Sequence, residues 1–240
     1  MATLLLLRHG RTTSNAEGTL AGRTPVRLDD VGVAQATATA GRLAGVPLAA
    51  VVSSPLDRCL QTVSLALPDV TPEIEERLTE CGYGDWEGKP LKQLAKDPLW
   101  RVVQARPSAV TFPGAEGEPM ATMSARAVAA VRDWDAKVSG VHGEGALWLA
   151  CSHGDVIKAI VADALGLHLD QFQRIMVEPA SITVIRYTPG RPFLVRLNDI
   201  SGALGGLVPP AGSRKRRSRK ADSDAAVGGG SGSAGAPAGD

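Results

Sequence analysis

Three short apolar segments divide this sequence and constrain its fold more than any other feature. They are Thr3 to Leu7, Ala49 to Ser53 and Ala146 to Cys151, and none shows the polar alternation of a half-exposed strand. We therefore expect each segment to be a strand that is buried on both faces. Strands that alternate with helices along a chain favour a mostly parallel sheet with helices on both sides.

Helical patterns fill the stretches between these strands. The Asp29-Asp30 pair can cap the first helix, whose apolar residues recur at helical spacing as far as Leu43. A second helix should follow Pro55, and two more are expected at about residues 118–138 and 155–165.

The pattern changes near the end of the apolar part of the chain. Ser181 to Tyr187 and Phe193 to Leu197 flank a Thr-Pro-Gly-Arg turn, which predicts a β-hairpin. The expected fold is α/β, a three-layer α/β/α sandwich with a mostly parallel central sheet and a C-terminal hairpin strand. The hairpin edge at Phe193 to Leu197 also suggests a homodimer as a possible assembly.

The last part of the sequence differs from the rest in composition and charge. The whole chain has 26 Lys and Arg against 25 Asp and Glu, so its formal net charge is +1. Residues 211–240 contain six basic and three acidic residues, which leaves 20 basic and 22 acidic residues in 1–210. We expect a folded domain at 1–207 and a disordered Gly, Ser, Pro and Ala-rich tail at 208–240. Nucleic-acid binding through the basic cluster of that tail is a hypothesis from another class, although such charge runs are usually only solvated.

The cysteine content and the hydropathy of the sequence indicate the cellular compartment of the protein. Cys59, Cys81 and Cys151 are too few and too widely spaced for a disulfide framework, which favours a reducing compartment. The apolar run from Leu4 to Leu7 is too short for a signal peptide, and no stretch approaches the ~20 apolar residues that cross a bilayer. We therefore expect a cytoplasmic protein without a membrane partner.

Histidines and arginines follow the expected strands at equivalent positions. Arg8 and His9 follow the first strand, Ser54 to Arg58 the second, and Ser152-His153-Gly154 the third. Catalytic residues of open α/β sheets gather beyond the carboxyl ends of the strands, so neighbouring strands would bring these side chains together.

This combination of side chains suits a phosphoryl group. Arginine forks match phosphoryl oxygens, and Ser54-Pro55 opens a helix whose free backbone N–H groups also favour an anion. A neutral imidazole among these donors is a nucleophile that can accept the phosphoryl group, which divides the displacement into two steps.

Other chemistries have less support in the sequence. None of the three cysteines has an arginine six positions later, which excludes a cysteine-dependent phosphatase. The four histidines form no ligand-spaced pair, no Cys-x-x-Cys is present, and no Gly-x-Gly-x-x-Gly follows the first strand. We therefore expect neither a metal nor another cofactor.

Taken in order, these motifs resemble those of the histidine phosphatase superfamily, in the branch that includes cofactor-dependent phosphoglycerate mutase. Leu7-Arg8-His9-Gly10 matches the signature that carries the phosphorylated histidine, residues 53–58 match the second phosphate-binding segment, and Ser152-His153-Gly154 matches the second histidine. Asn15 matches the amide that follows the signature. The resemblance covers about residues 3–200 and implies a phosphoglycerate mutase-like fold, with 1–207 as the catalytic domain.

The resemblance also implies roles for these residues. His9 is the expected nucleophile, and His153 is a second catalytic residue. The expected ligands of the substrate phosphate are Arg8, Arg58, Asn15 and Arg11. A helix cap would explain Asn15 equally well, and a solvated arginine would explain Arg11.

Expulsion of an alkoxide requires a proton donor, and hydrolysis of phosphohistidine requires a base. Glu80 is the expected residue for both steps, because 78–88 resembles the acid-bearing loop of the family, in which the first glutamate acts. Without the resemblance, Glu80 would be interpreted as a solvated loop carboxylate, since Asp85 and Glu87 lie in the same segment.

The same chemistry serves phosphatases and phosphomutases. In phosphoglycerate mutases the catalytic glutamate is typically followed by Arg-His-Tyr-Gly, whereas Glu80 is followed by Cys-Gly-Tyr-Gly. The sequence therefore favours the broad-specificity branch, a histidine acid phosphatase-type phosphoric monoester hydrolase that acts on a small phosphorylated metabolite. A phosphoglycerate mutase-type phosphomutase is the alternative. The stretch at 89–118 is expected to form a lid over the leaving group or to pack on the domain, with Trp86 and Trp100 as core anchors.

Overall fold

The three apolar segments form the centre of a six-stranded sheet. The computed structural model describes residues 1–201 and orders the strands β3-β2-β4-β1-β5-β6. The central strand β4 (Leu147–Ser152) pairs in parallel with β1 (Thr3–Arg8) on one side and with β2 (Leu48–Ser53) on the other. The tail expected at 208–240, its basic cluster and the domain boundary at 207 lie outside the described residues.

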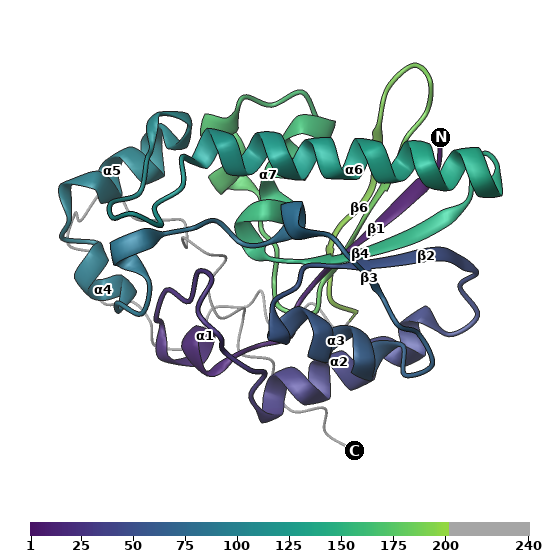
Figure 1. Cartoon of the computed structure of the whole chain (residues 1–240), viewed down its shortest axis with the longest axis horizontal. Coiled ribbons are helices and arrows are strands. Elements are labelled where there is room, and N and C mark those ends of the chain that lie inside the picture. The colour runs from purple at the N-terminus through teal and green to yellow at the C-terminus, as the bar shows by residue number, and fades with distance from the viewer. Residues whose placement is uncertain (202–240) are drawn as a thin grey trace, which may run out of the picture.

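Helices cover both faces of this sheet (Figure 1). Their bounds are α1 (Thr13–Glu17), α2 (Asp30–Leu43), α3 (Asp57–Ala66), α4 (Leu91–Leu94), α5 (Pro98–Ala105), α6 (Met120–His142) and α7 (Gly154–Ala164). Short 3₁₀ turns occur at Glu76–Leu78, Gly84–Trp86, Pro107–Ala109 and Leu169–Arg174. The four helices expected from the sequence correspond to α2, α3, α6 and α7, and Asp29 caps α2 by accepting a hydrogen bond from Gly32 N.

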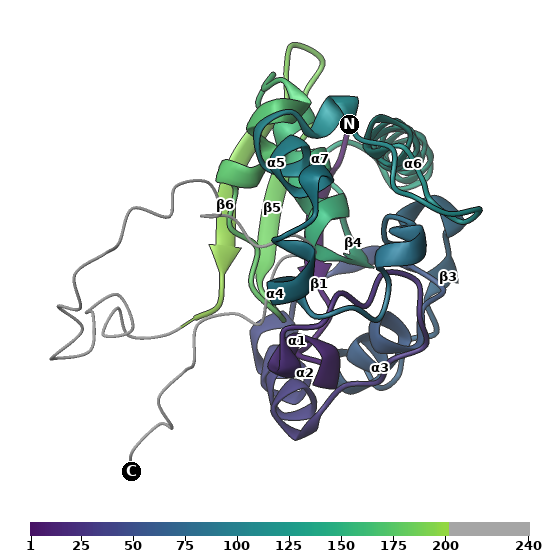
Figure 2. The ribbon, with the colours of Figure 1, turned by 90° about the vertical axis from the view of Figure 1, so that its left-hand side faces the viewer.

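Two apolar cores lie between the helices and the sheet, one on each face. Leu4 and Leu6 belong to the core shared with α6 and α7, whereas Leu5 and Leu7 belong to the core shared with α3. Successive side chains of a strand point to opposite faces, so a strand covered on both faces must be apolar at every position. This explains the unbroken apolar segments and confirms the three-layer sandwich (Figure 2).

The C-terminal strands form the expected hairpin. β5 (Ile182–Arg186) runs antiparallel to β1, and β6 (Phe193–Asp199) runs antiparallel to β5 at the sheet edge. The opposite edge is β3 (Glu73–Ile74), which the sequence did not predict because it has two residues and both are exposed. The homodimer through β6 stays a prediction.

The stretch between the acid-bearing loop and α6 lies beyond the carboxyl ends of the parallel strands (Figure 1). Trp86 and Trp100 are buried there, with ring centroids 6.1 Å apart. The two tryptophans belong to the larger apolar core and therefore act as core anchors, while a lid function stays a prediction. Within residues 1–201, no helix has the length and apolar character needed to cross a bilayer.

Candidate active site

Two histidines meet where β1 and β4 end. Arg8 is in register with Ser152, so the next residues, His9 and His153, emerge side by side. The His9 N–H donates to the Ser152 carbonyl at 3.1 Å, and the two imidazole centroids are 5.3 Å apart. Both side chains are buried. The parallel register thus brings together two residues that are far apart in the sequence.

Hydrogen bonding assigns the tautomer of His9. Its Nδ1 lies 2.7 Å from the Gly10 carbonyl oxygen, which can only accept, so Nδ1 carries the proton. Burial, followed by the positive charges of Arg58 and Arg8, lowers the pKa of His9 well below its ordinary value. The ring is therefore neutral at pH 7, and its Nε2 has a free lone pair for nucleophilic attack.

Two buried arginines supply positive charge to this pocket. Arg8 donates from Nη1 to the Val177 carbonyl at 2.7 Å, and burial lowers its pKa to about 10, so it stays charged at pH 7. Arg58 donates from Nη2 to the Gly22 carbonyl at 2.6 Å. The Nε of Arg58 is buried without a hydrogen-bond partner among the described residues. An unpaired buried N–H is costly, and a phosphoryl oxygen would satisfy it.

The carboxyl end of β2 adds Ser54 and the start of α3. Ser54 Oγ lies 2.7 Å from Nε2 of His153, and burial together with the charge of Arg58 lowers the pKa of His153 well below its ordinary value. α3 begins two residues after Pro55, and no side chain caps it. Its first backbone N–H groups therefore remain available to a ligand. The uncapped start of α3 favours an anion bound between these strand ends, beside a neutral His153.

Among the carboxyl groups of the acid-bearing loop, that of Glu80 is the one suited to proton transfer. The residue is 3% exposed, and its Oε1 accepts a hydrogen bond from Cys81 N at 3.0 Å. Burial, and then the negative charge of Asp155, raises the pKa of Glu80 to about 7. The alternatives fit less well, since Asp85 is exposed and Glu87 binds the backbone N–H groups of Arg23 and Tyr83.

Arg11 and Asn15 form contacts of another kind. Arg11 Nε donates to Asp29 at 2.7 Å. Asn15 Oδ1 accepts hydrogen bonds from the backbone N–H and hydroxyl of Thr12, which forms the capping box of α1. Both contacts are structural, and the phosphate-binding roles of Arg11 and Asn15 stay predictions. In the part of the chain that the structure describes, no group of three or more His, Cys, Asp or Glu is placed to hold a metal ion.

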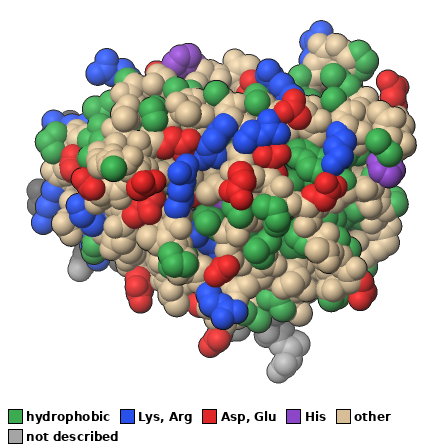
Figure 3. Space-filling view, in the orientation of Figure 1, with side chains coloured by type: hydrophobic (Ala, Val, Ile, Leu, Met, Phe, Trp, Pro, Cys, Tyr) green, Lys and Arg blue, Asp and Glu red, His purple; other side chains and the backbone are tan. Residues whose placement is uncertain are grey.

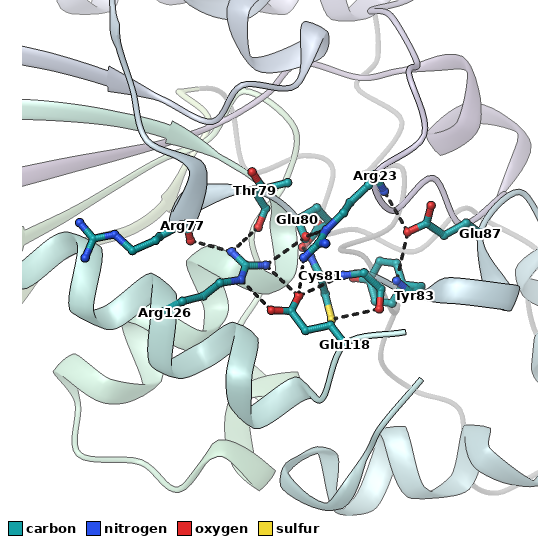
Figure 4. Close-up of polar contacts among 10 residues, drawn as sticks. Arg23, Arg77, Thr79, Glu80, Cys81, Tyr83, Glu87, Glu118 and Arg126 are labelled. Carbon is teal, nitrogen blue, oxygen red and sulfur yellow. Dashed lines mark hydrogen bonds and ion pairs between the residues drawn. The ribbon is translucent and has the colours of Figure 1, made fainter. Parts of the chain in front are cut away.

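A second cluster beside Glu80 was missed by the sequence analysis (Figure 4). Glu118 forms ion pairs with Arg126 and with Arg23, and all three side chains contact the backbone of the acid-bearing loop. The available signal was the placement of Glu118 and Arg126 around the start of one helix. Figure 3 shows one face of the molecule, on which Lys and Arg side chains lie next to Asp and Glu side chains.

The structure is an α/β fold in which two histidines and two buried arginines meet at the carboxyl ends of parallel strands. The family model described as Histidine phosphatase superfamily (branch 1) matches residues 4–200. The chain therefore belongs to the histidine phosphatase superfamily.

Individual relatives agree with this assignment. A bifunctional protein of Mycobacterium tuberculosis is 32% identical over 205 residues, which cover 84% of this chain and 54% of that protein. The chain thus spans about half the length of that relative. An acid phosphatase of the same organism is 32% identical over 214 residues, which cover 87% of this chain and 96% of that protein.

Solved structures share the fold. A phosphoserine phosphatase variant from Entamoeba histolytica, in complex with phosphoserine, is 25% identical and superposes with a TM-score of 0.73. The match covers 84% of this chain and 98% of that chain.

Proposed function

We propose that this protein is a phosphoric monoester hydrolase that acts through a phosphohistidine at His9. The observation that carries the proposal is a neutral His9 in a pocket with two buried arginines, whose charges also act on a buried carboxyl group, that of Glu80, with a pKa of about 7. A group with this pKa is present in both protonation states at neutral pH, so it can donate a proton in one step and accept one in the next.

In the first step, His9 Nε2 attacks phosphorus in line with the ester oxygen. The P–N bond forms while the P–O bond breaks, and Glu80 gives its proton to the departing oxygen. Arg8 and Arg58 stabilise the negative charge on the equatorial oxygens, and His153 lies beside them as a neutral hydrogen-bonding group. The products are an alcohol and phosphohistidine.

In the second step, the Glu80 carboxylate takes a proton from water. The hydroxyl oxygen attacks phosphorus, the P–N bond breaks, and inorganic phosphate leaves as His9 returns to its neutral form. Glu80 regains its proton, so the cycle closes without another reactant.

The substrate is expected to be a small phosphorylated metabolite. This rests on the acid phosphatase and phosphoserine phosphatase to which the chain is similar. Hydrolysis is favoured over isomerisation because Cys81 and Gly82 stand where the mutases typically carry Arg-His.

A panel of sugar phosphates, phosphoglycerates, phosphoserine and nucleotides tests the proposal through phosphate release. We expect release from at least one small ester and its loss in His9→Ala. Equal activity of His9→Ala and wild type would refute the nucleophile. Rapid isomerisation of 3-phosphoglycerate with 2,3-bisphosphoglycerate, without release of phosphate, would instead indicate a mutase.

A further inference from the structure

The carboxylate of Glu118 accepts four hydrogen bonds next to the acid-bearing loop at 78–88 (Figure 4). Arg126 donates from Nε to Oε1 at 2.7 Å and from Nη2 to Oε2 at 2.9 Å. Arg23 Nη2 and the backbone N–H of Gly82 donate to the same Oε2 at 2.8 Å and 3.1 Å. Glu118 therefore joins two arginines from distant segments to the residue two positions after Glu80.

Arg126 binds the chain that leads into Glu80. Its Nη1 donates to the carbonyls of Arg77 and Thr79 at 2.6 Å and 2.7 Å, and its Nη2 donates to the carbonyl of Glu80 at 3.1 Å. The planar guanidinium therefore holds three backbone oxygens in one geometry. Because α6 carries Arg126, this helix fixes the backbone from which the Glu80 side chain projects.

Arg23 joins the same cluster to the pocket formed by Arg8, His9, Arg58 and His153, which we call the phosphate pocket. Its Nε donates to the Glu80 carbonyl at 3.1 Å. The residues on either side of it, Gly22 and Thr24, accept hydrogen bonds from Arg58 through their carbonyls at 2.6 Å and 3.3 Å. One segment of three residues thus contacts both an arginine of the phosphate pocket and the backbone of the proton donor.

The packing around these contacts leaves little freedom. A Cβ added at Gly82 would lie 2.6 Å from the Glu116 carbonyl oxygen and 3.3 Å from Cζ of Arg23. The side chains of Glu118 and Arg126 are 10% and 18% exposed, so their ion pair is shielded from water. Burial acts to raise the pKa of Glu118, but the hydrogen bonds and charge of Arg126 outweigh it and lower the pKa overall, so the carboxylate is ionised.

We propose that Glu118 and Arg126 are positioning residues that set the location of the Glu80 carboxyl group relative to the leaving oxygen. This rests on the proposed function, in which Glu80 donates the proton. Within residues 1–201, the hydrogen bonds of both side chains join them to the loop backbone, to Arg23 and to each other, and none joins them to Arg8, His9, Arg58 or His153. They act on the reaction through Glu80.

The chemistry gives this role a distinctive kinetic signature. An alkoxide is a poor leaving group and needs a well-placed proton, whereas 4-nitrophenolate departs without one. Misplacement of the acid should therefore slow transfer from an alkyl phosphate and spare transfer from 4-nitrophenyl phosphate. A general loss of folding would slow both.

The test measures phosphoryl transfer to His9 in single turnovers of Glu118→Gln and Arg126→Lys. With the alkyl phosphate that wild type uses best, we expect a roughly 100-fold slower transfer. With 4-nitrophenyl phosphate, we expect a change below about threefold, and the substrate concentration for half-maximal rate should change little for either ester. Equal slowing of both esters, or no slowing of the alkyl ester, would overturn the proposal.

Arg132→Lys is the matched control. Arg132 also lies on α6 and donates two hydrogen bonds of 2.9 Å to one carboxylate, that of Asp163, but this pair does not contact the acid-bearing loop. We expect wild-type transfer rates with both esters. A loss of alkyl transfer as large as that of Arg126→Lys would show that any ion pair on α6 has the same effect, and would overturn the proposal.

Amide hydrogen exchange provides a second readout that does not depend on activity. In Glu118→Gln, exchange at Gly82 and its neighbours in 79–83 should become roughly tenfold faster, while the strand amides of β4 should not change. Unchanged exchange in the loop would also refute the positioning role. If wild type transfers no phosphate to His9 but the loop exchanges faster in the variant, the proposed function fails while the structural contact holds.

Discussion

The phosphate pocket and the acid-bearing loop are held in place by different interactions. His9 and His153 follow strands whose parallel register continues into the pocket, where His9 N donates to the Ser152 carbonyl. Glu80 lies on an irregular segment whose carbonyls are bound by arginine side chains from two other parts of the chain. The backbone ladder therefore fixes His9, the proposed nucleophile, whereas side-chain hydrogen bonds fix the backbone of Glu80, the proposed proton donor. Substitutions in the two regions should thus have different kinetic consequences.

The largest effect that separates the two regions is expected for Glu80→Gln. The amide keeps the shape of the side chain but removes its proton, so phosphate release from an alkyl ester should fall roughly 10³-fold. Steady-state release with phosphoserine or the best alkyl substrate measures this loss. An alkyl ester that is hydrolysed at the wild-type rate would show that Glu80 is not the acid.

Arg58→Lys should have a smaller effect that does not depend on the leaving group. Lysine keeps the charge but cannot reproduce the guanidinium fork or supply the buried Nε, so transition-state stabilisation falls by about 100-fold. Single-turnover transfer to His9 should slow equally for alkyl and aryl esters. Slowing confined to the alkyl ester would mean that Arg58 belongs functionally with the acid and not with the pocket.

The pH dependence should show a still smaller difference between the regions. Because the pKa of Glu80 is raised to about 7, its protonated form is present below that value and is lost as the pH rises through it. Single-turnover kcat/KM for an alkyl ester should therefore fall about tenfold per pH unit above 7. His9 and His153 have lowered pKa values, so they stay neutral and add no loss of activity between pH 7 and 6.

Glu80→Gln is the control for this profile. Ionisation of the substrate phosphate near pH 6 affects both enzymes equally, so it cancels in the ratio of their rates. The decline above pH 7 should be absent from the variant. Its persistence in Glu80→Gln would assign the titration to another group.

The difference between backbone pairing around His9 and side-chain hydrogen bonding around Glu80 also explains how much could be predicted from the sequence. Strands buried on both faces leave unbroken apolar segments, so β1, β2 and β4 were predicted, and the residues at their ends followed from topology. The proposal that Glu80 is the acid required the family resemblance, because the local sequence offers Asp85 and Glu87 as well.

The Glu118 and Arg126 cluster had no comparable signal. These residues contact a loop more than 30 positions away in the sequence, and their partners in that loop are backbone atoms, which leave no residue-type pattern. The two-residue strand β3 was missed for a related reason, since both of its side chains are exposed and only its backbone pairs with β2. Contacts made by backbone atoms of irregular segments are thus the part of the molecule that the sequence does not predict.

The proposed roles of His9 as nucleophile and Glu80 as acid and base can be tested in one measurement with Glu80→Gln and 4-nitrophenyl phosphate. The first step needs no proton donor with this ester, whereas the second step lacks its base, so the intermediate should accumulate. We predict a burst of about one 4-nitrophenolate per active site, with acid-labile and base-stable phosphate located on His9. No burst, or phosphate on a residue other than His9, would contradict the account.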